Sequence, residues 1–256
     1  MKSQGPILYE VQDEVAWITI NEPEKMNRLT FAAMRSMTQA LRAAELDEGI
    51  KIIVITGAGD RAFCVGADLA DFTTDSILEA KEKLSAYAEL CLTLHALTKP
   101  SIAMINGYAL AGGCGLAILP TFSIAADTAK FGVPEIKAGL WPMMVMAILF
   151  RTVGRKKGLE MICTGELIDA GEAERIGMIT RTVPSSTLRE EVLNLIDRLK
   201  ALPYPIMRLG LECFSRCEDM PFEQAIWYLR DAVVLLSHTP ESREARAAFF
   251  AKKSAS

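Results

Sequence analysis

Hydrophobic and polar positions in the first part of the chain predict two strands, a helix and a third strand. Apolar residues in Ile7–Val11 and in Val15–Ile20 flank a polar turn, which is the pattern of a hairpin. After Thr30, a residue type that caps helix N-termini, residues 31–46 carry apolar side chains at helical spacing. Residues 50–56 form an uninterrupted apolar run, which is typical of a strand covered on both faces.

The same rhythm recurs in the next part of the chain. Residues 75–97 have a helical pattern, and residues 101–105 and 122–126 are apolar runs of strand length. Between these two strands, the small residues 111–115 open a further helix. We interpret this as a repetition of architecture, because the sequence itself does not repeat.

Beyond Pro142 the pattern is mostly helical, with one strand predicted at Met178–Val183. The helical segments are 143–153, 155–163, 170–176, 186–200, 204–217, 222–237 and 240–252. The change near Pro184 predicts two parts. Residues 1–184 form an α/β core that carries the ligand site, and residues 185–256 form a helical region that packs on a neighbouring subunit.

Composition and charge narrow the class of protein. Half of the 256 residues are hydrophobic and 23% are charged, which is the balance of a folded soluble protein. There is no run of about 18 apolar residues and no signal-peptide pattern, so we expect a cytoplasmic protein that does not enter a membrane. A net charge of −4 argues against a nucleic-acid partner. Six cysteines without a CxxC pair, and only two histidines, give a metal site little support.

Two loops of small residues and one carboxylate are the candidate active-site features. The loops at 61–69 and 111–115 each lie between a strand and a helix, where unpaired backbone N–H groups can face a ligand. Two such loops can donate to the same oxygen. Glu135 follows in an apolar setting, and this combination indicates proton abstraction next to a carbonyl. No serine lies in a GxSxG context and no GxxxxGK[ST] loop is present, so serine hydrolysis and P-loop chemistry are disfavoured.

Four segments resemble the conserved segments of the crotonase family, which comprises the enoyl-CoA hydratases and isomerases. Ala62–Leu69 looks like the AFCAGADL segment of that family, and Asn106–Gly113 looks like its NGxAxGGG segment. Phe131–Glu135 is similar to FGxPE, and residues 164–184 are similar to TGxxxxAxEAxxxGxVxxVVP. The segments occur in the family order, so the resemblance covers nearly the whole chain.

The resemblance implies a spiral of repeated ββα units and a helical C-terminal region used for assembly into a homotrimer or a dimer of trimers. It implies an acyl-CoA thioester as substrate, with no permanently bound cofactor. The two oxyanion donors fall on the backbone N–H groups of Ala67 and Gly112, and the catalytic acid falls on Glu135. Further acyl-CoA contacts are implied for Lys25, Met26, Arg28, Val65, Gly66, Asp68, Leu69, Gly113, Pro134 and Met143. Lys25 and Arg28 would meet phosphates, or would otherwise be solvated surface charges.

The chain departs from the family's hydratases at Gly115, where those enzymes carry a second catalytic glutamate. Adding water to a double bond uses two carboxylates to hold and deprotonate the water. A lone glutamate can instead move a proton from C2 to C4 of a 3-enoyl thioester through an enolate, as in the family's single-glutamate isomerases. Two alternatives stay open. One is a hydratase or another crotonase-type lyase reaction with a non-standard second acid. The other is an acyl-CoA-binding protein with little catalysis.

Replacement acids and bulky methionines bear on these alternatives. The acids of the 75–89 helix (Asp75, Glu79, Glu82 and Glu89) are candidates for a second carboxylate, but their pattern fits a solvated face better. Met143, Met144 and Met146 stand where many hydratases have a glycine-rich segment. If they face the pocket, they would exclude water and suit a fatty or alicyclic acyl chain, and otherwise they belong to the helix core.

Overall fold

The computed structural model describes residues 5–68 and 74–254, and within them the longer strands form a six-stranded sheet. Its order is β1 (Ile7–Gln12), β2 (Val15–Ile20), β3 (Ile52–Gly57), β5 (Ser101–Ile105), β7 (Phe122–Ala126) and β10 (Arg181–Val183). β1 and β2 pair antiparallel, as a hairpin, and the other neighbours pair parallel. The strands predicted from the apolar runs are therefore confirmed, with small shifts at their ends.

A second sheet of very short strands runs alongside the first. Its order is β4 (Ala62–Cys64), β6 (Tyr108–Leu110), β8 (Lys130–Gly132) and β9 (Ile168–Asp169), with β9 antiparallel to β8. Each of β4, β6 and β8 follows a strand of the large sheet in the chain and leads towards a helix. This is the predicted spiral of ββα units.

Ten α-helices lie within the described residues, and the predicted helices agree with them closely. They are α1 (Phe31–Leu46), α2 (Ile77–His95), α3 (Gly112–Ile118), α4 (Met143–Thr152), α5 (Arg155–Thr164), α6 (Ala170–Arg175), α7 (Leu188–Lys200), α8 (Tyr204–Cys217), α9 (Phe222–Ser237) and α10 (Pro240–Ser254). Thr30 caps α1 as predicted, because its side chain accepts a hydrogen bond from the Ala33 N–H. Three short 3₁₀ helices join them: η1 (Pro23–Lys25), η3 (Pro134–Ala138) and η4 (Ser185–Thr187).

One predicted strand is wrong in extent. The strand expected at 178–183 begins only at Arg181. Met178 and Ile179 are buried in the core directly after α6, in a turn that contains Gly177 at φ 75°. Their apolar character therefore reflects core packing and not pairing in a sheet.

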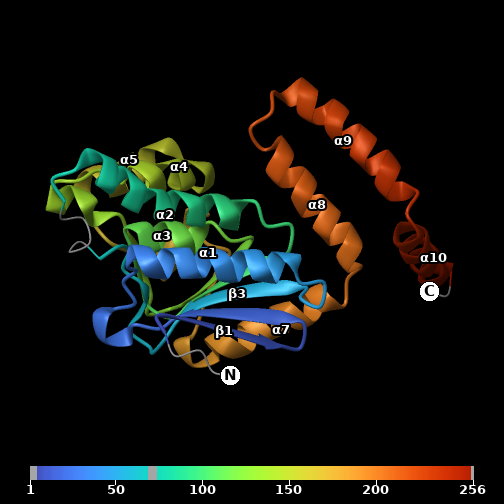
Figure 1. Ribbon diagram of the computed structural model, residues 1–256. Helices are drawn as coiled ribbons and strands as arrows, with labels where there is room; N and C mark the ends of the chain where they lie inside the picture. Colours follow the sequence, from blue (N-terminus) through green and yellow to red (C-terminus); the bar gives the residue numbers. More distant parts are fainter. Residues whose placement is uncertain (1–4, 69–73, 255–256) are drawn as a thin grey trace.

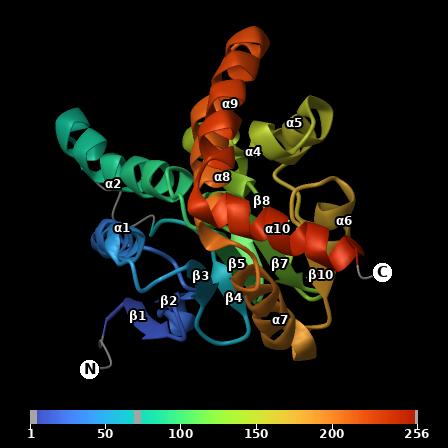
Figure 2. The ribbon, with the colours of Figure 1, turned by 90° about the vertical axis from the view of Figure 1, so that its right-hand side faces the viewer.

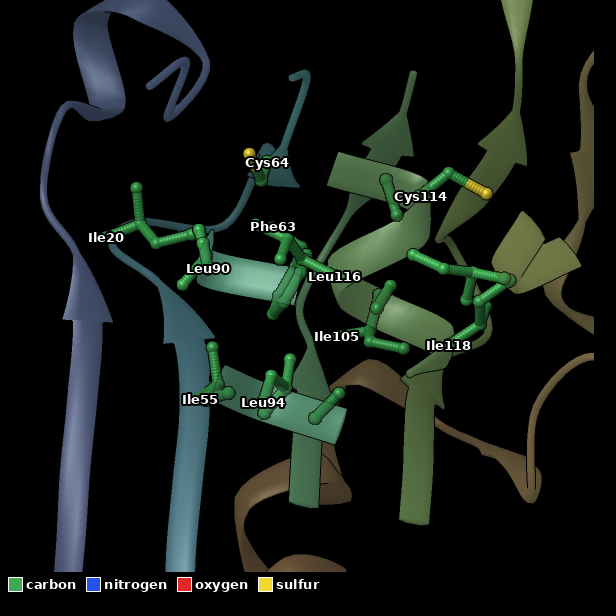
Figure 3. Close-up of a cluster of buried hydrophobic side chains, with 14 of the residues drawn as sticks. Ile20, Ile55, Phe63, Cys64, Leu90, Leu94, Ile105, Cys114, Leu116 and Ile118 are labelled. Atoms are coloured by element: carbon green, nitrogen blue, oxygen red, sulfur yellow. The ribbon is translucent and has the colours of Figure 1, made fainter. Parts of the chain in front are cut away.

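The two faces of the large sheet bury different sets of side chains. Ala16, Ile18 and Ile20 of β2 point into a core shared with α1, α2, α3 and the small sheet. Figure 3 shows part of this core, with Leu94 of α2 beside Ile55 of the large sheet and Leu90 near Ile20. Alternate residues of the same strands point to the opposite face, which α7 covers. Helices on both faces explain the continuous apolar runs in the sequence.

The helices after Lys200 extend away from this body. In Figure 1, α8, α9 and α10 lie to one side of the sheets. In Figure 2, α9 projects past the edge of the sheets. None of the residues of α9 is buried. α7, by contrast, packs on the large sheet as far as Leu199, although it follows residue 184. The division of the chain at residues 184 and 185 stays a prediction.

Candidate active site

Asn27 fixes the first loop of the candidate site. Its side chain is fully buried, its φ is 54°, and its Nδ2 donates hydrogen bonds to the carbonyls of Ala58 at 2.9 Å and Ala62 at 2.7 Å. The Glu22 N–H donates back to Asn27 Oδ1 at 3.0 Å. Asn106 Nδ2 adds donations to the Gly57 and Gly59 carbonyls at 2.9 and 2.7 Å. These two asparagines tie the 22–30 loop and β6 to the segment that leads into β4.

A single parallel bridge then joins Leu29 to Ala67. The Leu29 N–H donates to the Gly66 carbonyl at 2.8 Å, and the Asp68 N–H donates to the Leu29 carbonyl at 2.9 Å. In a parallel pair, a residue bonds to the two neighbours of the residue opposite it. Leu29 bonds in this way to Gly66 and Asp68, and the N–H of Ala67 points away from Leu29. The Ala67 N–H accordingly has no acceptor among the described residues. The bridge brings the two predicted acyl-CoA-binding loops together and leaves the predicted donor available.

The second loop is held by a strained residue at the start of α3. Ala111 has φ 53° and ψ −129°, a conformation that costs a residue with a Cβ about 1–3 kcal/mol. Its N–H donates to the Gly132 carbonyl at 2.9 Å, which links this turn to β8. Gly112 is the first residue of α3, and its N–H has no acceptor among the described residues. The second predicted donor is thus also available.

The two loops touch beside these donors. A Cβ placed on Gly66, which has φ 92°, would lie 3.0 Å from Gly112 N and 3.0 Å from Ala111 Cβ. A Cβ on Gly113 would lie only 2.1 Å from the Cys64 carbonyl oxygen. Glycine is therefore required for α3 to approach the end of β4 this closely.

Glu135 stands at the start of η3, directly after Pro134, and it is half-buried. Its Oε2 atom is buried and has no hydrogen-bond partner within the described residues. Burial raises the pKa of its carboxyl above the ordinary value, while a hydrogen bond from its own backbone N–H lowers the pKa by less. Burial, and secondly the charge of Glu135, raises the pKa of the Cys114 thiol to about 12. The carboxylate therefore lies within electrostatic reach of the first turn of α3.

Gly115 leaves no room for a second carboxylate. A Cβ placed there would lie 2.6 Å from the hydroxyl of Tyr87, 3.2 Å from Ile148 Cδ1 and 3.6 Å from Val145 Cγ1. The acids proposed as replacements on and before α2, which are Asp75, Glu79, Glu82 and Glu89, are all exposed. Glu79 is also paired with Lys83 at 2.7 Å. Tyr87 has no signature in the sequence, because its contacts depend on how α2 packs on α3.

The predicted basic side chains are already paired within the protein. Lys25 Nζ lies 3.2 Å from a carboxylate oxygen of Glu22, and Arg28 Nε lies 3.1 Å from Asp68 Oδ2. A bound phosphate would therefore compete with these carboxylates. The other predicted acyl-CoA contacts on the joined loops are Met26, Val65 and Gly66, and Gly113 and Pro134 lie on α3 and η3. Leu69 lies outside the described residues.

The three methionines after Pro142 have different surroundings. Met143 is 66% exposed. Met144 lines a cavity of about 770 Å³ between α2, α4 and α8, and also a second cavity of about 450 Å³ beside α2. Met146 packs against the core, and its sulfur accepts a hydrogen bond from Trp141 Nε1 at 3.4 Å. Ala67, Gly112 and Glu135 do not line either cavity. Ile148 lines the larger cavity, and its Cδ1 atom would lie 3.2 Å from a Cβ placed on Gly115.

Repeated ββα turns that end in a helical region are the architecture of the crotonase class. The sequence profile of the family described as "Enoyl-CoA hydratase/isomerase" matches residues 10–255. The chain belongs to that family, as the four sequence segments predicted, and it is an enzyme of the hydratase or isomerase type. An acyl-CoA thioester substrate fits the family.

Curated relatives and solved structures named as enoyl-CoA hydratases match this chain over nearly the whole length of both proteins. A probable enoyl-CoA hydratase of Rhizobium meliloti is 34% identical over 256 residues, which cover 99% of this chain and 98% of the relative. The crotonyl-CoA hydratase of Syntrophomonas wolfei is 32% identical over 250 residues, which cover 97% of this chain and 96% of the relative. The crystal structure of an enoyl-CoA hydratase of Mycobacterium smegmatis has a TM-score of 0.94 at 27% identity and covers 97% of each chain.

No helix in the described part of the chain combines the length and the apolar character needed to span a bilayer. No group of three or more His, Cys, Asp or Glu side chains within these residues is arranged to hold a metal ion.

Proposed function

We propose that the enzyme converts 3-enoyl-CoA thioesters into 2-enoyl-CoA thioesters with Glu135 as the only proton carrier. The Glu135 carboxylate removes a proton from C2, and the electron pair of that C–H bond forms the C1–C2 double bond of an enolate. The protonated Glu135 then returns the same proton to C4, the C3–C4 double bond shifts to C2–C3, and the thioester carbonyl re-forms. The reaction is balanced without water or an external acid.

The backbone N–H groups of Ala67 and Gly112 stabilise the enolate oxygen in this proposal. Both N–H groups lack an acceptor within the described residues, and their loops touch at Gly66. The first turn of a helix also carries partial positive charge, which favours an anion next to Gly112. Removing one donor of this kind typically lowers kcat by about 10²–10³-fold.

The observation that carries the proposal is the contrast between Glu135 and Gly115. Glu135 is half-buried, its pKa is raised, and its buried oxygen has no hydrogen-bond partner within the described residues. These properties are typical of a general base. At Gly115, where the second acid of the hydratases would stand, other side chains fill the space. One positioned carboxylate supports proton transfer, whereas water addition calls for two.

The names of the relatives favour a second candidate, which is hydration of enoyl-CoA or another crotonase-type lyase reaction with a non-standard second acid. The loss of the acid at Gly115 also keeps a third candidate open, an acyl-CoA-binding protein with little catalysis. A turnover panel of 2-enoyl, 3-enoyl, branched and cyclic acyl-CoA thioesters distinguishes the three, with products identified by mass. We expect 3-enoyl-CoA to give 2-enoyl-CoA faster than any thioester gains water. Hydration as the main reaction would support the second candidate, and tight binding without turnover would support the third.

We also propose that the chain assembles as a homotrimer or a dimer of trimers. The support is the set of large apolar side chains that α8, α9 and α10 leave exposed. The set is Phe214, Phe222, Ile226, Trp227, Leu229, Val233, Val234, Leu235, Phe249 and Phe250. Apolar side chains gathered on an exposed surface are typical of a protein–protein interface. The cytoplasmic location stays a prediction of the sequence.

A further inference from the structure

Tyr87 lies across the two glycines that form one face of the first turn of α3. Its hydroxyl donates a hydrogen bond to the Gly112 carbonyl at 2.8 Å. Its ring carbon Cε2 lies 3.1 Å from a Cβ placed on Gly112, and its hydroxyl oxygen lies 2.6 Å from a Cβ placed on Gly115. Residues three apart share a helix face, so one tyrosine ring covers both positions. The ring takes the volume that side chains at 112 and 115 would otherwise use.

The surroundings of Tyr87 are closed and mostly apolar. The side chain is 6% exposed, and Ile148 and Val145 of α4 close the other sides of the space above Gly115. Burial raises the pKa of the Tyr87 hydroxyl well above its ordinary value, so the phenol stays neutral and its proton stays in the bond to Gly112. The thiols of Cys64, Cys91 and Cys114 are the ionisable groups nearest to it, and burial raises the pKa of each to about 11 or 12. The atoms nearest to a Cβ at position 115 belong to Tyr87, Ile148 and Val145, so no second carboxylate beside Glu135 is among them.

We propose that Tyr87 determines the reaction specificity of the enzyme by occupying the position of the second carboxylate and of the water that this carboxylate would hold. Hydration would place a hydroxyl group on C3 and a proton on C2 of a 2-enoyl thioester, and the water would have to be deprotonated beside Gly115. With Tyr87 in that space, no water adds to C3. The dienolate that Glu135 forms by removing a C2 proton from a 3-enoyl thioester receives that proton at C4, and the 2-enoyl thioester is the final product. This inference rests on the isomerisation proposed above.

Tyr87 is at the same time a positioning residue for the oxyanion donor. It contacts Gly112, whose N–H is the proposed donor, and its hydroxyl bonds to the carbonyl of the same residue. The bond therefore joins α2 to the residue that carries the donor. A phenylalanine at 87 would keep the ring but lose this bond.

The geometry makes Tyr87 and an acid at 115 mutually exclusive. A Cβ 2.6 Å from an oxygen is far inside van der Waals contact, and the rigid ring and the bond to Gly112 prevent a small adjustment. Gly115→Glu alone should therefore restore little hydration. The double variant Tyr87→Ala/Gly115→Glu should gain it, because the space vacated by the ring receives the carboxylate.

The first test measures the ratio of 3-hydroxyacyl-CoA formation from a 2-enoyl-CoA to isomerisation of a 3-enoyl-CoA. We expect the double variant to raise this ratio at least about tenfold above wild type, as general acid–base assistance contributes at least that much. We expect Gly115→Glu alone to stay within about threefold of wild type. Tyr87→Phe should keep the ratio but lower isomerisation about fivefold, the loss of one hydrogen bond. An equal gain in Gly115→Glu alone would overturn the proposal.

The second test does not depend on activity. Gly115→Ala adds only a Cβ, and in the wild-type background it should lower the melting temperature by roughly 2–10 °C through overpacking. In a Tyr87→Ala background the same change should cost almost nothing. The matched control is a Leu90→Ala background, which truncates another buried side chain of α2 and should leave the cost of Gly115→Ala unchanged.

The two proposals fail separately. A Gly115→Ala cost that is the same in the Tyr87→Ala and Leu90→Ala backgrounds would refute the role of Tyr87, whatever reaction the enzyme performs. If the wild-type enzyme isomerises no 3-enoyl-CoA, the proposed function fails. The stability cycle and the hydration gain of the double variant would then still decide whether Tyr87 excludes a second acid.

Discussion

At the scale of single residues, the carboxyl group of Glu135 is the proposed proton carrier. Pro134 begins the 3₁₀ helix that holds it, and this helix ends at Gly139 with φ 74°. A buried oxygen without a partner is costly and rare in folded proteins, so such an atom usually marks a place where a ligand completes the contacts. A thioester with an acidic C2–H group is a ligand of this kind.

The raised pKa of Glu135 predicts the acid limb of the pH profile. The carboxylate is the reactive form, so activity should fall as pH drops through the folded-state pKa, which lies above the ordinary value of 4.5 for Glu. We expect log kcat/KM for 3-enoyl-CoA to decline with a slope of about one per pH unit in a range above that value. A rate that stays constant down to pH 4.5 would contradict the raised pKa.

The same pKa predicts how Glu135 affects folding. A carboxyl group whose pKa is raised by folding stabilises the fold below its unfolded-state pKa, and this stabilisation is lost as pH rises through the folded-state pKa. Glu135→Gln should therefore be more stable than wild type at neutral pH, by less than about 2 kcal/mol because solvent partly screens the group. The difference should disappear in acid. Melting curves of both proteins, recorded between about pH 4 and pH 8, measure this difference. A Glu135→Gln protein less stable than wild type at neutral pH would contradict the prediction.

How well residues were predicted from the sequence depends on how local their contacts are. Ala67, Gly112, Gly115 and Glu135 lie in short segments that resemble family motifs, and their proposed roles come from that resemblance. The hydrogen bond of Tyr87 spans 25 residues of sequence, and those of Asn27 to the start of β4 span 31 and 35. Such contacts depend on how helices and loops pack on one another, which the residue pattern alone does not specify.

At the scale of elements, the length of a strand decides whether the sequence pattern predicts it. The strands of the large sheet outside β10 are five or six residues long, and their apolar runs were recognised. β4, β6 and β8 have three residues each and β9 has two, which is too short for an alternating pattern to stand out. The residue pattern therefore predicts only a loop at 61–69. Its first residues nevertheless form β4, which aligns the donor loop with α3.

Lys99 stabilises the C-terminal end of α1. The residue is 1% exposed, and its Nζ donates to the carbonyls of Ala44 at 2.8 Å and Asp47 at 2.6 Å. The Ala44 carbonyl belongs to the last turn of α1, where helix carbonyls lack an N–H of a following turn, and the Asp47 carbonyl just after the helix also accepts the Ile50 N–H at 3.0 Å. The ammonium group also complements the negative end of the helix dipole. Burial, and after it the charge of Arg208, lowers the pKa of Lys99, while the carboxylates of Glu45, Asp47 and Glu48 partly offset this.

Lys99→Met should destabilise the fold by about 1.5–3 kcal/mol, because two buried carbonyls lose a charged donor while the apolar stem is kept. Denaturant unfolding followed by circular dichroism measures the change. Lys156→Met, at an exposed position on α5, is the matched control and should shift stability by less than about 0.5 kcal/mol. Equal stabilities of the two variants would show that the Lys99 contacts contribute nothing.

At the scale of the whole molecule, the chain consists of a two-sheet body and an extended arm of three helices. α1, α2 and α3 cover one face of the large sheet and α7 covers the other, so the body has its own core. α9 buries none of its residues within the chain. The sequence pattern predicted helices in this region correctly, but it does not show which faces are left without a partner, because that depends on the path of the chain.

The exposed apolar face of α9 predicts an effect on assembly. The double variant Val234→Glu/Leu235→Glu places charges where the wild-type side chains are 52% and 72% exposed. We expect it to dissociate the trimer or hexamer into smaller species, because buried charges at an interface are unfavourable. Light scattering after size-exclusion chromatography measures the mass. Leu46→Glu, at an 82% exposed position at the end of α1, is the control and should leave the mass unchanged. A monomeric wild-type protein would contradict the assembly.

The most direct test of the whole account is the isomerisation rate of Glu135→Gln beside that of Glu166→Gln, an acid-to-amide change at an exposed position. The amide keeps the shape of Glu135 but cannot accept the C2 proton. The account predicts that Glu135→Gln loses about 10²–10⁴-fold in kcat and still binds acyl-CoA, while Glu166→Gln is unaffected. Turnover of 3-enoyl-CoA by Glu135→Gln at the wild-type rate would contradict it.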